Sequence, residues 1–273
     1  MKTRIISGIV VVALLVLMLV ANSFWSPIAV IFLSVLAALS SYEMLHNTGA
    51  VKSKAVLTSA IAYSALVQYA YADILPVPPV ILTAAYALVI ALLALRYHSN
   101  FERETVFASL SMPILFSYSF STIETLLNGE GFGLVYIVLL LNFSSIADCF
   151  AYFTGVAFGK HKLAPVISPK KTIEGAVGGV IGSVIGTVVI CLIFNNILTG
   201  AKSNMLLLCL ITPLMVAVGI VGDLFTSQIK RSYGIKDYGK LIPGHGGVID
   251  RMDSVLFCAP VLLLLVKYLE VIS

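Results

Sequence analysis

The chain has 273 residues, of which 59% are hydrophobic and 11% are charged, and its mean hydropathy is +1.03. A soluble globular protein carries roughly 25% charged residues, so a compact water-soluble core is excluded and a membrane protein is predicted. The net charge of +4 is spread over short loops and indicates no nucleic-acid partner.

About nine apolar segments are long enough, at roughly 20 residues each, to cross a bilayer as helices. We expect them at residues 5–22, 27–45, 55–73, 77–97, 106–127, 133–158, 174–198, 204–232 and 250–271. Backbone polar groups must be satisfied within lipid, and the strand alternation of a membrane barrel does not occur. The predicted fold is therefore an all-α polytopic bundle. The first segment exceeds the core of a signal peptide and is interpreted as a retained helix.

The distribution of basic residues predicts the orientation of these helices. With the N-terminus in the cytoplasm, fifteen of the 17 Lys and Arg residues fall on the cytoplasmic side and the C-terminus lies outside. This orientation predicts a multi-pass protein of a cell (inner) membrane, with the long polar loops 159–173 and 233–249 in the cytoplasm. Residues 1–105 carry few buried charges and are interpreted as scaffold, and residues 106–273 as the catalytic region.

The segment 204–232 ends in a polar face. Asp223, Ser227, Lys230 and Arg231 are spaced so that they share one side of a helix. Carboxylates in spanning helices are rare and usually functional, which favours a site. The alternative is a structural Asp below a Lys-Arg pair that reaches toward the membrane surface.

Asp250 and Asp253 begin the last predicted helix, three residues apart, where free backbone N–H groups favour negative charge. Either residue alone could simply cap the helix. Together with Asp223 they would repel one another unless a cation lay between them. Oxygen ligands of this kind suit Mg²⁺.

A glycine-rich segment, residues 236–247, connects these two helices. Its glycines allow backbone N–H groups to approach an anion closely, although such a turn can also be merely tight. His245 is flanked by glycines, and we expect it either to contact the substrate or to pack within the loop.

Further candidates come from the middle of the chain. Asp148 lies near the cytoplasmic end of its helix, either as a structural residue or as a further ligand of the cation. Lys170 and Lys171 could clamp a polyphosphate or could merely set the topology. Thr172 can cap the next helix, and Gly175 begins a face of small residues suited to close helix packing.

Five other polar residues lie near the ends of predicted spans, and the sequence indicates no partner for them. We interpret them as interfacial or structural. They are His46, His98, Glu43, Glu124 and Glu130.

The sequence thus combines carboxylates that could bind a cation, Lys and Arg residues that could bind phosphate, and a glycine turn at the bilayer boundary. This combination suits phosphoryl or nucleotidyl transfer between a nucleotide and a lipid phosphate. Such chemistry consists mostly of positioning and charge neutralisation. A phosphomonoester has its second pKa at about 6, so the nucleophile is already ionised and requires no dedicated base.

The segment from Ser227 to Asp253 reads S-Q-I-K-R-S-Y-G-I-K-D-Y-G-K-L-I-P-G-H-G-G-V-I-D-R-M-D. It resembles the C-terminal signature of phosphatidate cytidylyltransferases, also called CDP-diacylglycerol synthases. The S-P-K-K-T-I-E-G segment and the Asp148 helix also resemble this family, so the likeness by motif covers about residues 145–253. The first third of the chain resembles it only as hydrophobic helices.

This resemblance implies that CTP and phosphatidic acid react to give CDP-diacylglycerol and pyrophosphate, with Mg²⁺, at the cytoplasmic face of the lipid bilayer. A second cation and a homodimer are left open. The candidate catalytic residues are Asp223, Lys230, Arg231, Asp250 and Asp253. The candidate substrate-binding residues are Ser227, Lys170, Lys171, Lys236, His245, Gly246, Gly247 and Arg251. The candidate metal ligands are Asp148, Asp223, Asp250 and Asp253.

Three other functions have sequence requirements that can be compared with this chain. A CTP-dependent polyprenol kinase would use a similar membrane site but transfer the γ-phosphoryl group. An ion-coupled transporter could use Asp148 and Asp223 as a relay, but the paired broken helices expected of two related halves do not occur. The motif of a CDP-alcohol phosphotransferase is also absent from the sequence.

Overall fold

The structure is a computed structural model that describes residues 2–97, 103–129, 132–197, 202–244, 246–269 and 271–272. His98, Glu130 and His245, each considered above, lie outside the described residues. In chain order the elements are α1 (Lys2–Phe24), α2 (Pro27–Tyr42), the π-turn η1 (Glu43–Asn47), α3 (Lys54–Tyr71), α4 (Pro79–Arg96), α5 (Arg103–Asn128), α6 (Gly133–Leu141), the π-turn η3 (Asn142–Ile146), α7 (Ala147–Phe158), β1 (Lys162–Ala164), β2 (Ser168–Thr172), α8 (Ile173–Ile197), α9 (Met205–Ser232) and α10 (Ile249–Tyr268).

Each predicted span coincides with a helix to within a few residues, and α6, η3 and α7 together form the one expected at 133–158. Among the described residues, seven helical segments are long and apolar enough to cross a membrane. The other two are α3 and α10, which carry more polar residues: α3 contains Lys54 and Gln68, and α10 begins with three charged side chains. The all-α polytopic fold class is confirmed, while the orientation stays a prediction.

The helices group into two compact units. Unit 1 contains residues up to Thr125 together with Ser232–Met252, and unit 2 contains Leu126–Arg231 together with the residues from Asp253 onward. The predicted boundary at residue 105 concerns function rather than packing, and it stays a prediction.

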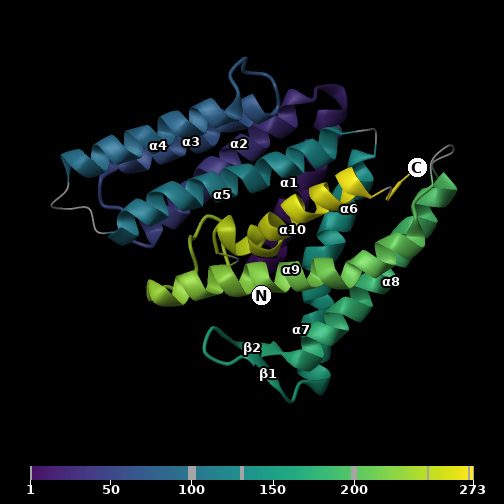
Figure 1. The fold of residues 1–273 in the computed structure, drawn as a ribbon. Coiled ribbons are helices and arrows are strands. Elements are labelled where there is room, and N and C mark those ends of the chain that lie inside the picture. Colours follow the sequence, from purple (N-terminus) through teal and green to yellow (C-terminus); the bar gives the residue numbers. More distant parts are fainter. Residues whose placement is uncertain are drawn as a thin grey trace. The chain divides into compact units, whose positions relative to one another are not determined.

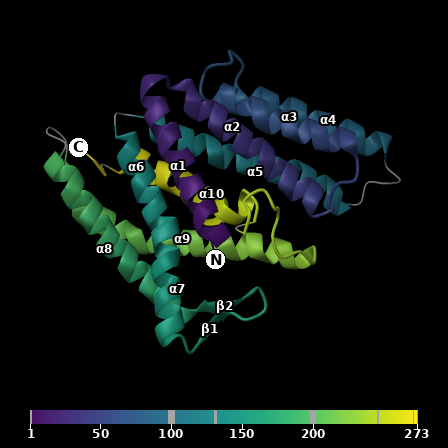
Figure 2. The same cartoon turned by 180° about the vertical axis from the view of Figure 1, so that it is seen from behind.

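Unit 1 is built on the packing of α2, α3 and α4, and Figures 1 and 2 show α3 and α4 lying side by side. Proline at the first turn of α2 and of α4 fixes the backbone where each helix begins. The rings of Tyr63 and Tyr86 stack in the core with their centroids 4.3 Å apart. The hydroxyls of Ser41 and Ser64 form a buried hydrogen bond of 2.7 Å between α2 and α3.

Unit 2 contains an extensive contact between α7 and α8. A Cβ atom at Gly178 would overlap the side chain of Thr154, and one at Gly182 would overlap the ring of Phe150. The predicted face of small residues is therefore confirmed. Glycine is required here because the two helices approach too closely for any side chain, a packing mode common in membranes.

The helix α9 packs within unit 2 through both α8 and α10. The Thr187 and Thr212 hydroxyls, from α8 and α9, lie 2.9 Å apart, and the Cys258 thiol of α10 donates to the carbonyl of Met215 at 3.4 Å. A Cβ at Gly222 would lie 2.9 Å from the carbonyl oxygen of Asp253. The backbone of α9 at Gly222 therefore packs closely against α10 at Asp253.

The polar loop predicted at 159–173 contains a short antiparallel hairpin, in which Lys162 pairs with Thr172 and Ala164 pairs with Ser168. Figures 1 and 2 both show this hairpin next to the end of α7. The hairpin gives the lysines of the loop a fixed backbone.

Candidate active site

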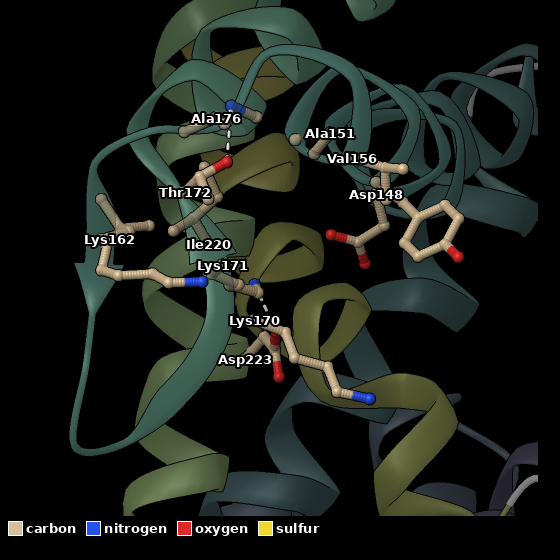
Figure 3. A pocket seen from close by; sticks show the side chains of 15 residues that line it. Asp148, Ala151, Val156, Lys162, Lys170, Lys171, Thr172, Ala176, Ile220 and Asp223 are labelled. Carbon is tan, nitrogen blue, oxygen red and sulfur yellow. Dashed lines mark hydrogen bonds and ion pairs between the residues drawn. The ribbon is translucent and has the colours of Figure 1, made fainter.

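A cavity of about 550 Å³ lies in unit 2 between α7, the hairpin, the first turn of α8 and α9. Its charged lining consists of two carboxylates and three lysines, supplied by α7, β1, β2 and α9 (Figure 3). These residues are Asp148, Lys162, Lys170, Lys171 and Asp223. The volume lies within the range of about 300–1,000 Å³ that is typical of small-molecule sites.

Two of the charged groups in this cavity form an ion pair, Lys171 Nζ with Asp223 Oδ2, drawn as a dashed line in Figure 3. The two side chains are 23% and 19% exposed. Ser227, one turn further along α9, donates its hydroxyl to Asp223 Oδ1 at 3.2 Å. The predicted proximity of Ser227 to Asp223 on one helix face is observed.

The hairpin is held against the helices by several hydrogen bonds. Thr172 Oγ1 accepts a bond of 3.1 Å from the N–H of Gly175, as expected of a cap, and the N–H of Ile173 donates to the carbonyl of His161. Arg231 Nε donates to the carbonyl of Ile167 at 3.5 Å. These bonds orient the strand that carries Lys170 and Lys171.

Glu174 is a further anchor that the sequence did not single out. Its carboxylate accepts hydrogen bonds from the backbone N–H groups of Lys160 and His161, and it lies 2.6 Å from His161 Nδ1. Glu174 therefore closes the base of the hairpin rather than facing the cavity.

A second carboxyl group, that of Asp253, is close enough to Asp223 for a hydrogen bond between the two groups. It also interacts electrostatically with Asp148 and with the ammonium of Lys230, which is only 8% exposed. The Asp253 carboxyl accepts a bond of 2.8 Å from the N–H of Ser254. Three carboxylates and two lysines, Lys171 and Lys230, therefore influence one another within unit 2.

Nowhere in the described part of the chain do three or more His, Cys, Asp or Glu side chains converge closely enough to hold a metal ion by themselves. Asp223 and Asp253 are the pair that could share one. Lys171 already neutralises part of the charge of Asp223.

In unit 1 the glycine-rich segment curls around Asp250, which is 8% exposed. Asp250 Oδ2 accepts hydrogen bonds from the N–H groups of Tyr238 at 2.7 Å and Gly247 at 3.0 Å. Gly246 has a φ of +88°, and a Cβ there would lie 2.7 Å from the same carboxylate. The anion closest to these glycines is therefore a side chain of the protein itself.

Glu43 corrects the sequence interpretation, which found no partner for it. It is only 4% exposed, and its two carboxylate oxygens accept bonds from the N–H groups of Val248 at 3.0 Å and Ile249 at 3.2 Å. Residues 1–105 thus contain a buried carboxylate that organises the signature segment. Carboxylates in apolar helices are rare and usually functional, so the sequence could have identified Glu43 in the same way as Asp223.

The other predicted residues of unit 1 lie on its surface. Lys236 is exposed and lines a second cavity, of about 660 Å³, together with Lys240 and Asn47. Arg251 is exposed on the first turn of α10. The predicted substrate contacts of Lys236 and Arg251, like those of the two glycines, stay predictions.

Comparison with known proteins gives a family match along nearly the whole chain. A family model described as the cytidylyltransferase family matches residues 2–269. Relatives named phosphatidate cytidylyltransferase include one from Thermotoga maritima, 39% identical over 142 residues, which are 51% of this chain and 52% of the relative. Others are from Staphylococcus haemolyticus, 42% identical over 48% of each chain, and Haemophilus influenzae, 41% identical over 47% of this chain and 43% of the relative. The aligned part spans about half the length of these curated relatives.

Proposed function

Because this chain belongs to the cytidylyltransferase family, we propose that it transfers CMP from CTP to phosphatidic acid, giving CDP-diacylglycerol and pyrophosphate. The names of the relatives from three bacteria support this choice of acceptor. The observation that carries the proposal is the unit 2 cavity, in which three lysines and two carboxylates line a space large enough for phosphate groups.

In this reaction an ionised oxygen of the phosphatidate attacks the α-phosphorus of CTP. A new P–O bond forms, the bond between the α-phosphorus and the bridging oxygen to the β-phosphate breaks, and pyrophosphate leaves with the electron pair. The phosphatidate is already ionised near pH 7, so no side chain has to remove a proton. The task of the protein is to hold two polyanions in line and to neutralise their charge.

The lysines of the hairpin suit that task. Lys170, Lys171 and Lys162 enter the cavity from one side, where their ammonium groups would bind the phosphates. Lys230 is buried near the carboxylates, and we propose that its positive charge offsets the negative charges of Asp223 and Asp253. Arg231 has two roles in this proposal. Its Nε holds the hairpin through the carbonyl of Ile167, and the rest of its guanidinium would bind the substrate phosphates.

The donor set of unit 2 fits Mg²⁺. This ion is usually held by one or two carboxylates together with substrate phosphates and water, so Asp223 and Asp253 suffice as protein ligands. We propose these two as ligands and retain Asp148, which also belongs to unit 2, as a candidate for a further contact; the role of Asp250 as a ligand stays a prediction from the sequence. When bound, the ion would neutralise charge on the phosphates and on the leaving pyrophosphate.

We further propose that the site faces the cytoplasm of a cell membrane, where CTP is available. The excess of Lys and Arg in the loops 159–173 and 233–249 supports this orientation. The lipid substrate would reach the cavity from the bilayer that surrounds the helices.

The proposal is tested with purified protein in detergent micelles that contain phosphatidic acid, with CTP labelled at either the α- or the γ-phosphorus. We expect the α label to enter the lipid and the γ label to appear in pyrophosphate. A γ label in lipid, given a polyprenol acceptor, would identify a lipid kinase instead. If neither label enters any lipid in the presence of Mg²⁺, the proposal is wrong.

A further inference from the structure

The glycine loop, defined here as residues 236–244 and 246–249, contains a set of backbone N–H groups that binds anions. Two of its donors, the N–H groups of Val248 and Ile249, point to the carboxylate of Glu43 from the π-turn η1. Asn47, one turn further along η1, donates to the carbonyl of Tyr238 at 2.7 Å. One short turn in the N-terminal part of the chain therefore contacts both ends of a loop some 200 residues away in sequence.

Two glycines of this loop lie too close to the Glu43 carboxylate to accept a side chain. A Cβ at Gly247 would overlap both carboxylate oxygens of Glu43, and a Cβ at Gly239 would lie 2.5 Å from Oε1. Gly247 does not have a positive φ, so its backbone conformation would accept alanine. What excludes a side chain at Gly247 is the carboxylate of Glu43.

A buried carboxylate is costly unless its oxygens are bonded. Glu43 satisfies this requirement by using backbone donors that a phosphate could otherwise take, at the N-terminus of α10 where negative charge is favoured. Asp250 binds a second pair of donors, from Tyr238 and Gly247. The loop is thus held between two carboxylates that belong to the protein.

We propose that Glu43 is a positioning residue: its carboxylate serves as the internal anion that fixes the glycine loop and thereby the start of α10. This inference rests on the proposed function only where it predicts turnover. The consequence for the reaction is that Asp250 and Arg251, on the first turn of α10, are oriented through Glu43. In this proposal Glu43 acts on the reaction through the loop and not through a contact of its own with the substrate.

The first test measures amide hydrogen exchange in the intact protein in detergent, without substrate. We expect Glu43→Gln to accelerate exchange across residues 238–250 by about 10- to 100-fold, because the two N–H donors use separate carboxylate oxygens, and the amide nitrogen that replaces one of these oxygens cannot accept a hydrogen bond. Asp73→Asn, the same carboxylate-to-amide change at an exposed residue of unit 1, is the control and should leave exchange in the loop unchanged. Unchanged exchange in Glu43→Gln would overturn the proposal whether or not the protein has the proposed activity.

The second test is a pair of substitutions that exploits the overlap at Gly247. Gly247→Ala alone should accelerate loop exchange strongly, and the same change in a Glu43→Ala background should add little, because the group that the new methyl would strike has gone. Additive effects of the two changes would contradict the assignment. Should Glu43→Ala not fold, Glu43→Ser in the same cycle gives an equivalent answer.

Steady-state kinetics distinguish a positioning role of Glu43 from competition between Glu43 and a substrate phosphate. We expect Glu43→Gln to lower kcat by about 10- to 100-fold with a smaller change in KM for CTP, since the loop loses its fixed geometry. A lower KM for CTP in this variant would show instead that Glu43 competes with a substrate phosphate, and the proposal would be wrong. If the wild-type protein shows no transfer at all, the proposed function fails while the exchange measurements still decide the role of Glu43.

Discussion

The ion pair between Lys171 and Asp223 allows a structural role to be separated from a catalytic one. Asp223→Asn removes the charge but keeps the shape, and it leaves the ammonium of Lys171 without its partner. Surface pairs contribute about 0–1 kcal/mol, and breaking a fully buried pair costs about 3–5 kcal/mol. With exposed fractions of 23% and 19%, this pair falls between them, so we expect a destabilisation of about 1–3 kcal/mol.

The effect on turnover should be larger. Asp223 is proposed to hold a cation next to the reacting phosphates, and losing such electrostatic stabilisation typically lowers rates by about 10²–10³-fold. Thermal unfolding in detergent, followed in the same preparation, should show a fall in Tm of about 2–10 °C. Incorporation of α-labelled CTP into lipid measures the loss of turnover.

The double variant Lys171→Met/Asp223→Asn provides the decisive comparison. Removing both charges leaves no unpaired ion, so we expect Tm to recover toward the wild-type value while turnover stays low. Recovery of turnover together with Tm would show that the pair is structural only. Wild-type turnover in Asp223→Asn alone would remove Asp223 from the catalytic site.

Three further results are expected. Lys162→Met should raise KM for a phosphate-bearing substrate by about 10-fold, through loss of one charge-assisted contact, while Lys52→Ala, at an exposed residue of unit 1, should change little; steady-state kinetics would show the difference. Gly178→Ala should destabilise the α7–α8 contact by about 1–3 kcal/mol, because its methyl overlaps Thr154, and an unchanged Tm would contradict this packing. Chelation of divalent cations should abolish transfer, and Mg²⁺ should restore it in the wild-type protein but not in Asp253→Asn; full activity in chelator would exclude the proposed ion.

The helices could be predicted from the sequence because a spanning helix is encoded locally. About 20 apolar residues in succession leave the backbone few alternatives in lipid, so even α9, with Pro213 in its interior, has the expected bounds. The hairpin was missed for the opposite reason. Its strands are three and five residues long, and their pairing depends on the Glu174 and Arg231 contacts rather than on any alternating pattern.

The candidate site could be predicted only in part. The helical spacing of Asp223, Ser227 and Lys230 is a local property, and the contacts of unit 2 agree with it. Glu43 could not be connected to Val248 from spacing, because 205 residues separate them and one sequence contains no signal of that contact. The glycines were correctly expected to approach an anion, but the sequence could not tell a bound phosphate from a carboxylate of the protein.

This difference in partners divides the acidic residues of the two units into two kinds. Asp223 is paired with a lysine in a cavity, so its charge can be shared with a substrate or a cation. Asp250, like Glu43, is bonded to backbone N–H groups, so its charge maintains the shape of a loop. These acidic residues therefore differ in what their loss should change. Replacing Asp223 should alter the chemistry at an unchanged loop, whereas replacing Glu43 should alter the loop first and the chemistry as a consequence.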